Sequence, residues 1–166
     1  MLQAFLPALR EARGRVVLMG SIAGRSALPF LGAYAMSKFA LEAMADALRV
    51  ELEPWGMQVV IVEPGTIATP IWSKPQRSAD ALPPEATDLY GTRLQAFRRA
   101  AAERSSKRAV PVDIVADAVE HALTAPKPKT RYVVGPDAKR RARVQRLPDR
   151  ARDRVLARFL FGKPER

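Results

Sequence analysis

The sequence predicts an α/β fold built on a parallel β-sheet. Two continuous apolar runs, 16–19 and 59–62, have the composition of strands that are buried on both faces, as the strands of parallel sheets are. A long amphipathic stretch at 34–53 separates them, with short connections on either side. The order strand, helix, strand favours parallel strands that are joined by a right-handed crossover.

Glycine and proline residues mark where the predicted elements begin and end. Gly14 follows apolar residues at helical spacing, and Pro54 with Gly56 follows the long helix. Pro111 precedes a later helix. The predicted elements are, in chain order, a helix at 2–12, a strand at 15–19, a helix at 34–53, a strand at 57–62, an irregular loop at 70–90, a polar helix at 91–106, a helix at 114–123 and a strand at 131–135.

Composition narrows the class of protein. The chain has 166 residues, of which 48% are hydrophobic, which suits one globular domain or a piece of one. It has no cysteine and a single histidine, His121, so thiolate and multi-histidine metal centres are excluded. We find no secretory signal and no apolar run of about 20 residues, and therefore expect a cytoplasmic protein.

The positive charge is concentrated at the C-terminal end. The net charge is +11, and residues 138–166 contain eleven Lys and Arg against three Asp and Glu, which gives +8 for that segment. A solvated, partly disordered tail is one interpretation. Contact with an anionic membrane or nucleic acid, or with another subunit, is the other. Because the rest of the chain carries only +3, no specific nucleic-acid binding is expected.

Tyr34 and Lys38 form the first candidate for chemistry. They are four residues apart on the predicted helix 34–53, so their side chains share one helical face. A lysine ammonium beside a phenol favours the phenolate, and a tyrosine tuned in this way is a usable general acid or base. Such pairs are common on helices, so catalysis is predicted only if other functional groups converge on them.

Ser21 is the second candidate. It directly follows the strand 15–19 at its carboxyl end, where open α/β sheets bind ligands. Its hydroxyl could hydrogen-bond an oxygen on which charge develops. A turn serine that only satisfies nearby backbone groups is the alternative.

The second strand runs into a turn with a similar character. Pro64-Gly65 ends it, and Ile67 and Thr69 follow. Gly65 would let a flat ring approach the backbone, and the Thr69 hydroxyl could donate to a phosphate or an amide. An ordinary strand-exit turn would look the same when taken alone.

Together these elements resemble the active-site half of the short-chain dehydrogenase/reductase family over residues 2–135. Ser21 lies 13 positions before Tyr34-Ala35-Met36-Ser37-Lys38, and Pro64-Gly65 with Thr69 follows the next strand. The resemblance implies a Rossmann-like, doubly wound parallel sheet, incomplete here, with about three strands and flanking helices. Residues 1–137 would be the catalytic part, and 138–166 a basic amphipathic tail outside the shared pattern.

The resemblance implies an oxidoreductase that transfers hydride between NAD or NADP and an alcohol or ketone. Tyr34 would exchange the proton with the substrate oxygen, Lys38 would assist it and bind the nicotinamide ribose, and Ser21 would orient the substrate. The nicotinamide end of the cofactor would contact Tyr34, Lys38, Pro64, Gly65, Ile67 and Thr69.

The glycine-rich phosphate turn of the family is expected before residue 1. Such a turn cradles a pyrophosphate at a helix N-terminus, and the nine glycines of this sequence do not form one. The residue that separates NAD from NADP would lie there too. We therefore expect residues 1–166 to be truncated, to expose an apolar edge on the strand 15–19, and to bind the cofactor poorly without turnover. A misplaced start, with upstream sequence restoring the enzyme, is the alternative.

Two other functional classes were weighed. A serine hydrolase would need a G-x-S-x-G turn, but Ser21 stands one position too early in Gly20-Ser21-Ile22-Ala23-Gly24. A non-catalytic truncated paralogue or interaction module stays open, because the family often pairs its corresponding helices between subunits. The residues that could support such a homo-oligomer are Leu6, Leu9, Met44 and Leu48.

The substrate is predicted only as a class. In the family the loop at 71–89 shapes the substrate pocket, and here it contains Trp72 and Leu82, with Tyr90 nearby. These residues favour a hydrophobic alcohol or ketone. Glu63-Pro64-Gly65, Ile71-Trp72 and the basic end are similar to retinol and steroid dehydrogenase branches, and suggest peripheral contact with a membrane.

Overall fold

The computed structural model describes residues 2–69 and 83–162 and contains a three-stranded parallel sheet. The strands are β1 (Arg15–Met19), β2 (Gln58–Pro64) and β3 (Arg131–Val134), in the spatial order β1-β2-β3. The predicted α/β fold with about three parallel strands is therefore confirmed. The apolar runs are strands because both of their faces are covered by helices.

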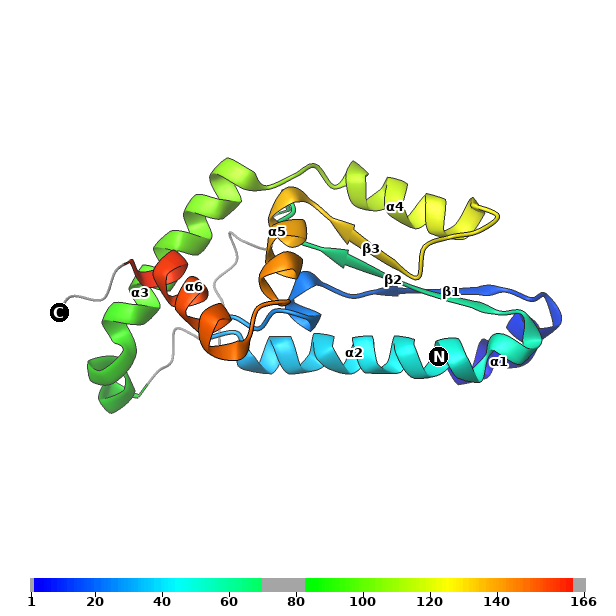
Figure 1. The fold of residues 1–166 in the computed structure, drawn as a ribbon, viewed down its shortest axis with the longest axis horizontal. Helices are drawn as coiled ribbons and strands as arrows, with labels where there is room; N and C mark the ends of the chain where they lie inside the picture. The colour runs from blue at the N-terminus through cyan, green and yellow to red at the C-terminus, as the bar shows by residue number, and fades with distance from the viewer. Residues whose placement is uncertain (1, 70–82, 163–166) are drawn as a thin grey trace.

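Six α-helices and two short 3₁₀ turns are connected to this sheet in the described ranges (Figure 1). The helices are α1 (Leu2–Glu11), α2 (Gly32–Glu51), α3 (Pro84–Arg108), α4 (Asp113–Thr124), α5 (Pro136–Val144) and α6 (Asp149–Phe161), and the 3₁₀ turns are η1 (Ile22–Gly24) and η2 (Glu53–Trp55).

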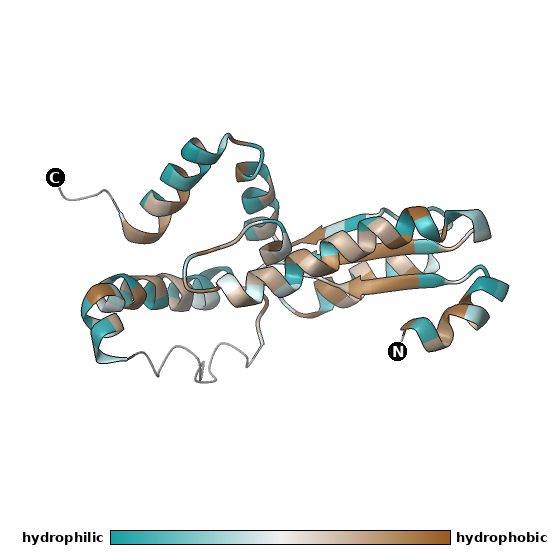
Figure 2. Ribbon diagram, turned by 90° about the horizontal axis from the view of Figure 1, so that it is seen from below, coloured by the Kyte–Doolittle hydropathy of each residue, from teal (hydrophilic) through white to brown (hydrophobic). Residues whose placement is uncertain are grey.

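The sheet is covered on both faces. Helix α2 lies along one face and α4 along the other, while α3, α5 and α6 lie beyond the carboxyl ends of the strands (Figure 1). Hydrophobic residues, brown in Figure 2, run along the strands between these helices. The core under α1 and α2 is formed by Val16, Ala45, Leu52, Met57, Val59 and Ile61. The core under α4 is formed by Val62, Val115 and Val134.

Strand β1 is an edge strand among those described. It pairs with β2 alone, and the side chain of Met19 at its end is 47% exposed. The predicted apolar edge is thus present in the structure. Leu6, Leu9 and Leu48, which could have supported a homo-oligomer, pack against the core within the chain, while Met44 is 39% exposed.

The structure corrects two expectations. Helix α3 begins at Pro84, inside the segment that was predicted to be a loop, because proline is well suited to the first turn of a helix. Residues 138–162 are not a solvated, disordered tail: they form most of α5 and all of α6, and Ala138 and Leu160 are buried. The boundary expected at 137/138 falls within α5.

Contacts with α3 explain why so basic a segment folds. Helix α6 packs on α3, and the guanidinium groups of Arg104 and Arg140 lie 5.5 and 5.6 Å from the ring centre of Phe159. Cations over an aromatic ring are attracted by its electron-rich face. None of the described helices is long and apolar enough to cross a membrane. The substrate-loop residues Ile71, Trp72 and Leu82 lie outside the described residues.

Candidate functional site

The predicted site residues lie at the carboxyl edge of the sheet. The register places Met19 opposite Val62, and the N–H of Gly20 donates to the carbonyl of Val62 at 2.9 Å. Ser21 therefore leaves β1 at the level where β2 approaches its own end at Pro64. Helix α2 begins beside this edge, with Tyr34 in its first turn (Figure 1).

Tyr34 and Lys38 lie on one face of α2, as their spacing predicted. The Lys38 ammonium is 5.8 Å from the centre of the Tyr34 ring, which is 47% exposed. The Nζ of Lys38 donates to the carbonyl of Met19 at 3.1 Å. Met19 lies just before residues 20–25, which include Ser21 and are called the serine loop. An ammonium has three donors, so this bond anchors Lys38 and leaves it able to bind a ligand as well.

Ser21 is the N-cap of η1. Its Oγ accepts a hydrogen bond from the Ala23 N–H at 3.1 Å. This is the role of a turn serine that satisfies nearby backbone groups, the alternative to a role in catalysis. A hydroxyl has one donor in addition to its acceptor lone pairs, so the capping bond still leaves Ser21 able to donate to a ligand oxygen.

Gly24 lets the serine loop approach helix α2, which carries Tyr34 and Lys38. A Cβ on Gly24 would stand 2.8 Å from the carbonyl oxygen of Lys38, closer than real Cβ contacts, and 3.0 Å from Cγ of Glu42, which is tighter than most. No flexible side chain can relieve the first of these contacts, since it involves helix backbone. Gly24 therefore sets the distance between the loop that carries Ser21 and the helix that carries Lys38.

We expect Gly24→Ala to destabilise the protein by about 1–3 kcal/mol, the typical cost of overpacking a close contact. Gly32→Ala is the matched control, because a Cβ on Gly32 meets nothing within 4 Å and alanine favours a helix. Urea denaturation followed by circular dichroism measures both. Equal stability of the two variants would show that the close approach at Gly24 is not required.

The turn after β2 is held by main-chain hydrogen bonds. The N–H of Gly65 donates to the carbonyl of Val134 at 2.9 Å, and the N–H of Thr69 donates to the carbonyl of Ile67 at 2.9 Å. These two amides stabilise the turn itself. Among the predicted cofactor residues of this turn, which are Pro64, Gly65, Ile67 and Thr69, only Thr69 has a side-chain donor. Its hydroxyl could donate a hydrogen bond to a ligand.

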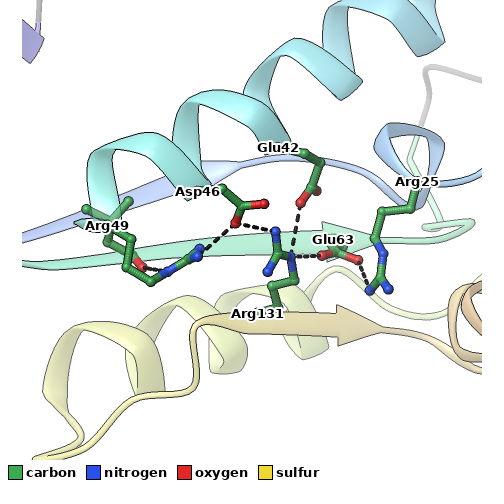
Figure 3. Close-up of polar contacts among 7 residues, drawn as sticks. Arg25, Glu42, Asp46, Arg49, Glu63 and Arg131 are labelled. Atoms are coloured by element: carbon green, nitrogen blue, oxygen red, sulfur yellow. Dashed lines mark hydrogen bonds and ion pairs between the residues drawn. The ribbon is translucent and has the colours of Figure 1, made fainter. Parts of the chain in front are cut away.

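A buried charge network joins the elements that carry the site (Figure 3). Glu63, the residue before Pro64, is fully buried and lies 3.4 Å from Arg25 of the serine loop and 3.3 Å from Arg131 of β3. Arg131 also reaches Glu42 on α2 at 3.2 Å and Asp46 at 2.5 Å. The network thus connects the serine loop, helix α2, the end of β2 and β3.

Glu63 and Asp46, two carboxylates of this network, have opposite pKa shifts. Burial, and then the nearby charge of Glu42, raises the pKa of Glu63, although Arg25 and Arg131 act against that shift. A hydrogen bond from Arg49 lowers the pKa of Asp46, with a further contribution from Arg131. Sequence reasoning missed the network, yet a signal existed: Glu63 is a charged residue that directly follows a fully buried strand run.

Helix α5 supplies residues that sequence reasoning missed entirely. The Arg141 guanidinium donates to the carbonyl and to Oγ of Ser26, a residue with no exposed surface. Burial lowers the pKa of Arg141 to about 10. Asp137, in the first turn of α5, hydrogen-bonds the turn after β2. Nothing in the local sequence distinguishes these residues from a solvated basic segment.

Comparison with known proteins agrees with the α/β fold. The model of the short chain dehydrogenase family matches residues 1–80. Human retinol dehydrogenase 16 is 38% identical over 82% of this chain and 45% of its own length. An NADPH-dependent 3-dehydrocapnine reductase from Ornithobacterium rhinotracheale is 40% identical over 91% of this chain and 53% of its own length.

Solved structures of short-chain dehydrogenases have a similar fold. A short-chain dehydrogenase from Streptomyces avermitilis superposes with a TM-score of 0.66 at 26% identity, over 94% of this chain and 54% of that protein. A short chain dehydrogenase from Burkholderia cenocepacia in complex with NADP gives a TM-score of 0.63 at 27% identity, over 99% of this chain and 54% of that protein.

The three parallel strands with helices on both faces form an incomplete Rossmann-like α/β fold. The chain belongs to the short-chain dehydrogenase/reductase family. It spans about half the length of the relatives that it matches.

Proposed function

We propose that the chain provides the proton-transfer half of an NAD- or NADP-dependent oxidoreductase that interconverts an alcohol and a ketone. The observation that carries this proposal is the convergence of Tyr34, Lys38 and the Ser21 loop at the carboxyl end of β1, with Lys38 anchored to Met19. This is the edge at which open α/β sheets bind ligands. The relatives support the same reaction class.

The side chains of the site divide the proton chemistry among them. The nicotinamide, when bound, donates or accepts the hydride. In the direction of reduction, the Tyr34 hydroxyl gives its proton to the substrate oxygen, and in oxidation the phenolate takes that proton back. The ammonium of Lys38 stabilises the phenolate by its charge. The Ser21 hydroxyl hydrogen-bonds the substrate oxygen and orients it.

The donor groups at the edge fit the nicotinamide end of the cofactor. Lys38 can hydrogen-bond ribose hydroxyls with the donors that Met19 does not use. The Thr69 hydroxyl and the main chain from Pro64 to Ile67 would contact the nicotinamide side. Both NAD and NADP are compatible with this set, because the two cofactors have the same nicotinamide half.

We propose a hydrophobic alcohol or ketone as the substrate. Human retinol dehydrogenase 16 and 17-beta-hydroxysteroid dehydrogenase type 6 are among the relatives, at 38% and 37% identity. Tyr90, on α3 near the expected substrate loop, is 54% exposed. Pairing of two copies and contact of residues 138–166 with an anionic membrane stay predictions.

Binding of the nicotinamide half can be tested directly on residues 1–166. We expect reduced nicotinamide mononucleotide to shift the backbone amide NMR signals of Lys38 and Gly65, with a dissociation constant on the order of 1 mM, equivalent to about 4 kcal/mol. Lys38→Met should weaken this binding about tenfold, because it removes a charge-assisted hydrogen bond.

Lys107→Met is the matched control, since Lys107 is an exposed lysine that pairs with Glu103 on α3. Shifts that are absent in the wild type, or that are equally strong in Lys38→Met, would contradict the proposed cofactor site. Micromolar binding of intact NADH or NADPH to residues 1–166 would contradict the separate expectation that this chain alone binds the whole cofactor poorly.

A further inference from the structure

We infer that Asp137 is a positioning residue that holds the Gly65-Thr66 turn ready for the nicotinamide end of the cofactor. Asp137 is the last residue of the expected catalytic part, and it lies in the first turn of α5, a helix that otherwise belongs mostly to the basic segment 138–166. The inference rests on the proposed function, and it assigns to α5 a part in that function.

Two hydrogen bonds carry the inference. Oδ2 of Asp137 accepts from the main-chain N–H of Thr66 at 2.8 Å and from its Oγ1 at 2.8 Å. The two residues are 71 positions apart in the chain, and Asp137 is 5% exposed. A buried carboxylate that accepts two such bonds holds the turn more firmly than exposed contacts would, because hydrogen bonds to a charged acceptor are about twice as strong as neutral ones.

Two glycines make room for this carboxylate. A Cβ on Gly65 would collide with Oδ1 of Asp137, and a Cβ on Gly135 would stand 3.0 Å from the same atom. Gly135 also has a φ of +98°, a backbone conformation that favours glycine. The turn after β2 and the turn after β3 are therefore both shaped around Asp137.

The second oxygen of Asp137 has an unusual environment. Oδ1 is buried, and among the described residues it accepts no hydrogen bond. A buried acceptor without a partner is unfavourable, so a merely structural cap would be expected to satisfy both oxygens. The charges of Arg104 and Arg141 offset part of this cost, since both interact favourably with Asp137.

The test measures cofactor affinity separately from substrate affinity. Thr66→Val removes the hydroxyl bond to Asp137 and keeps both the shape of the side chain and the main-chain bond. We expect it to weaken binding of reduced nicotinamide mononucleotide about fivefold, corresponding to one ordinary hydrogen bond. Thr66→Ser, which keeps the hydroxyl, should restore the affinity.

Asp137→Ala removes both bonds and should weaken cofactor binding about 10–100-fold. In the wild type, Thr66→Val and Asp137→Ala the KM for the nicotinamide cofactor should rise in that order, while the KM for the alcohol changes little. A loss of stability alone would not raise the KM for the cofactor while leaving the KM for the alcohol unchanged. If Asp137→Ala fails to fold, the Thr66→Val and Thr66→Ser pair still decides.

The outcomes separate the inference from the function on which it rests. Wild-type binding with unchanged affinity in Thr66→Val and Asp137→Ala would overturn the positioning role and leave the proposed function intact. No binding by the wild-type chain would overturn the proposed cofactor site, and the positioning role with it. Weaker binding in Thr66→Val that Thr66→Ser does not restore would also contradict the inference, because the hydroxyl bond would then not be the cause.

Discussion

Replacing Tyr34 with phenylalanine should lower the NAD(P)-dependent turnover of the protein by about 10²–10⁴-fold, the usual contribution of a general acid or base. The substitution removes one oxygen and preserves the ring, which is half exposed at the start of α2. The Lys38 ammonium would keep its bond to Met19. The loss should therefore appear in kcat, with little change in the affinity for the substrate.

Tyr132→Phe is the matched control for this experiment. Tyr132 lies on β3, and its hydroxyl contacts Nδ1 of His121 at 2.7 Å and accepts from the N–H of Lys129 at 3.1 Å, away from the carboxyl edge of the sheet. Loss of these bonds should affect stability and leave turnover nearly unchanged. Equal turnover in the wild type and Tyr34→Phe would contradict the role of Tyr34 as the general acid or base, and no turnover in either would favour a non-catalytic interaction module.

Removing the cation at the centre of the buried charge network should have the largest effect on stability. Arg131→Met should lower the free energy of unfolding by about 3–5 kcal/mol, the typical cost of breaking a buried ion pair on one side. Glu42 and Glu63 would stay buried without the guanidinium that lies 3.2 and 3.3 Å from them (Figure 3). Guanidinium chloride denaturation at several pH values measures the difference.

The destabilisation in Arg131→Met should depend on pH with a defined sign. Burial already raises the folded-state pKa of Glu63, and loss of Arg131 would raise it further. A group whose folded pKa exceeds its unfolded pKa binds more protons when the protein is folded. Its contribution to stability is therefore lost as the pH rises from the unfolded pKa through the folded pKa. The deficit should therefore be largest at neutral pH and smallest near about pH 4, where an unfolded glutamate titrates.

Two further variants complete this experiment. Adding Glu63→Gln to Arg131→Met should recover part of the lost stability, because a neutral amide costs less to bury than an unpaired carboxylate. Lys107→Met breaks the exposed pair with Glu103 and should leave stability unchanged within error, since exposed ion pairs contribute little. A deficit in Arg131→Met that is independent of pH would show that packing, and not charge, is lost.

Much of the site was predictable because its signals are local. The helical spacing of Tyr34 and Lys38 places both on one face, and the apolar run before Ser21 marks a buried strand with a known functional end. The strand 15–19 was predicted with the bounds that β1 has, and helix 34–53 overlaps α2 closely. The spacing of apolar residues and the local composition are enough to predict a strand or helix of this kind, because both are properties of one continuous segment.

The errors fell where distant residues determine the structure. Residues 138–166 contain many arginines, and by composition they resemble a solvated tail. Their helices are stabilised by partners far away in the sequence, such as Ser26 for Arg141 and Arg104 for Phe159. The pattern of residues within one segment cannot predict such pairs, since the two partners meet only when the folded sheet brings distant parts of the chain together.

The sequence by itself determined the parallel sheet, the succession of strands and helices up to residue 135, and the spacing that brings serine, tyrosine and lysine toward one edge, because each depends on a few turns or strands. Only the tertiary structure revealed that Glu63 joins the serine loop to β3, and that Asp137 holds the turn at Thr66. Both are buried carboxylates whose partners come from separate elements. Their roles depend on which charges and donors folding places beside them, and the local pattern of residues does not contain that information.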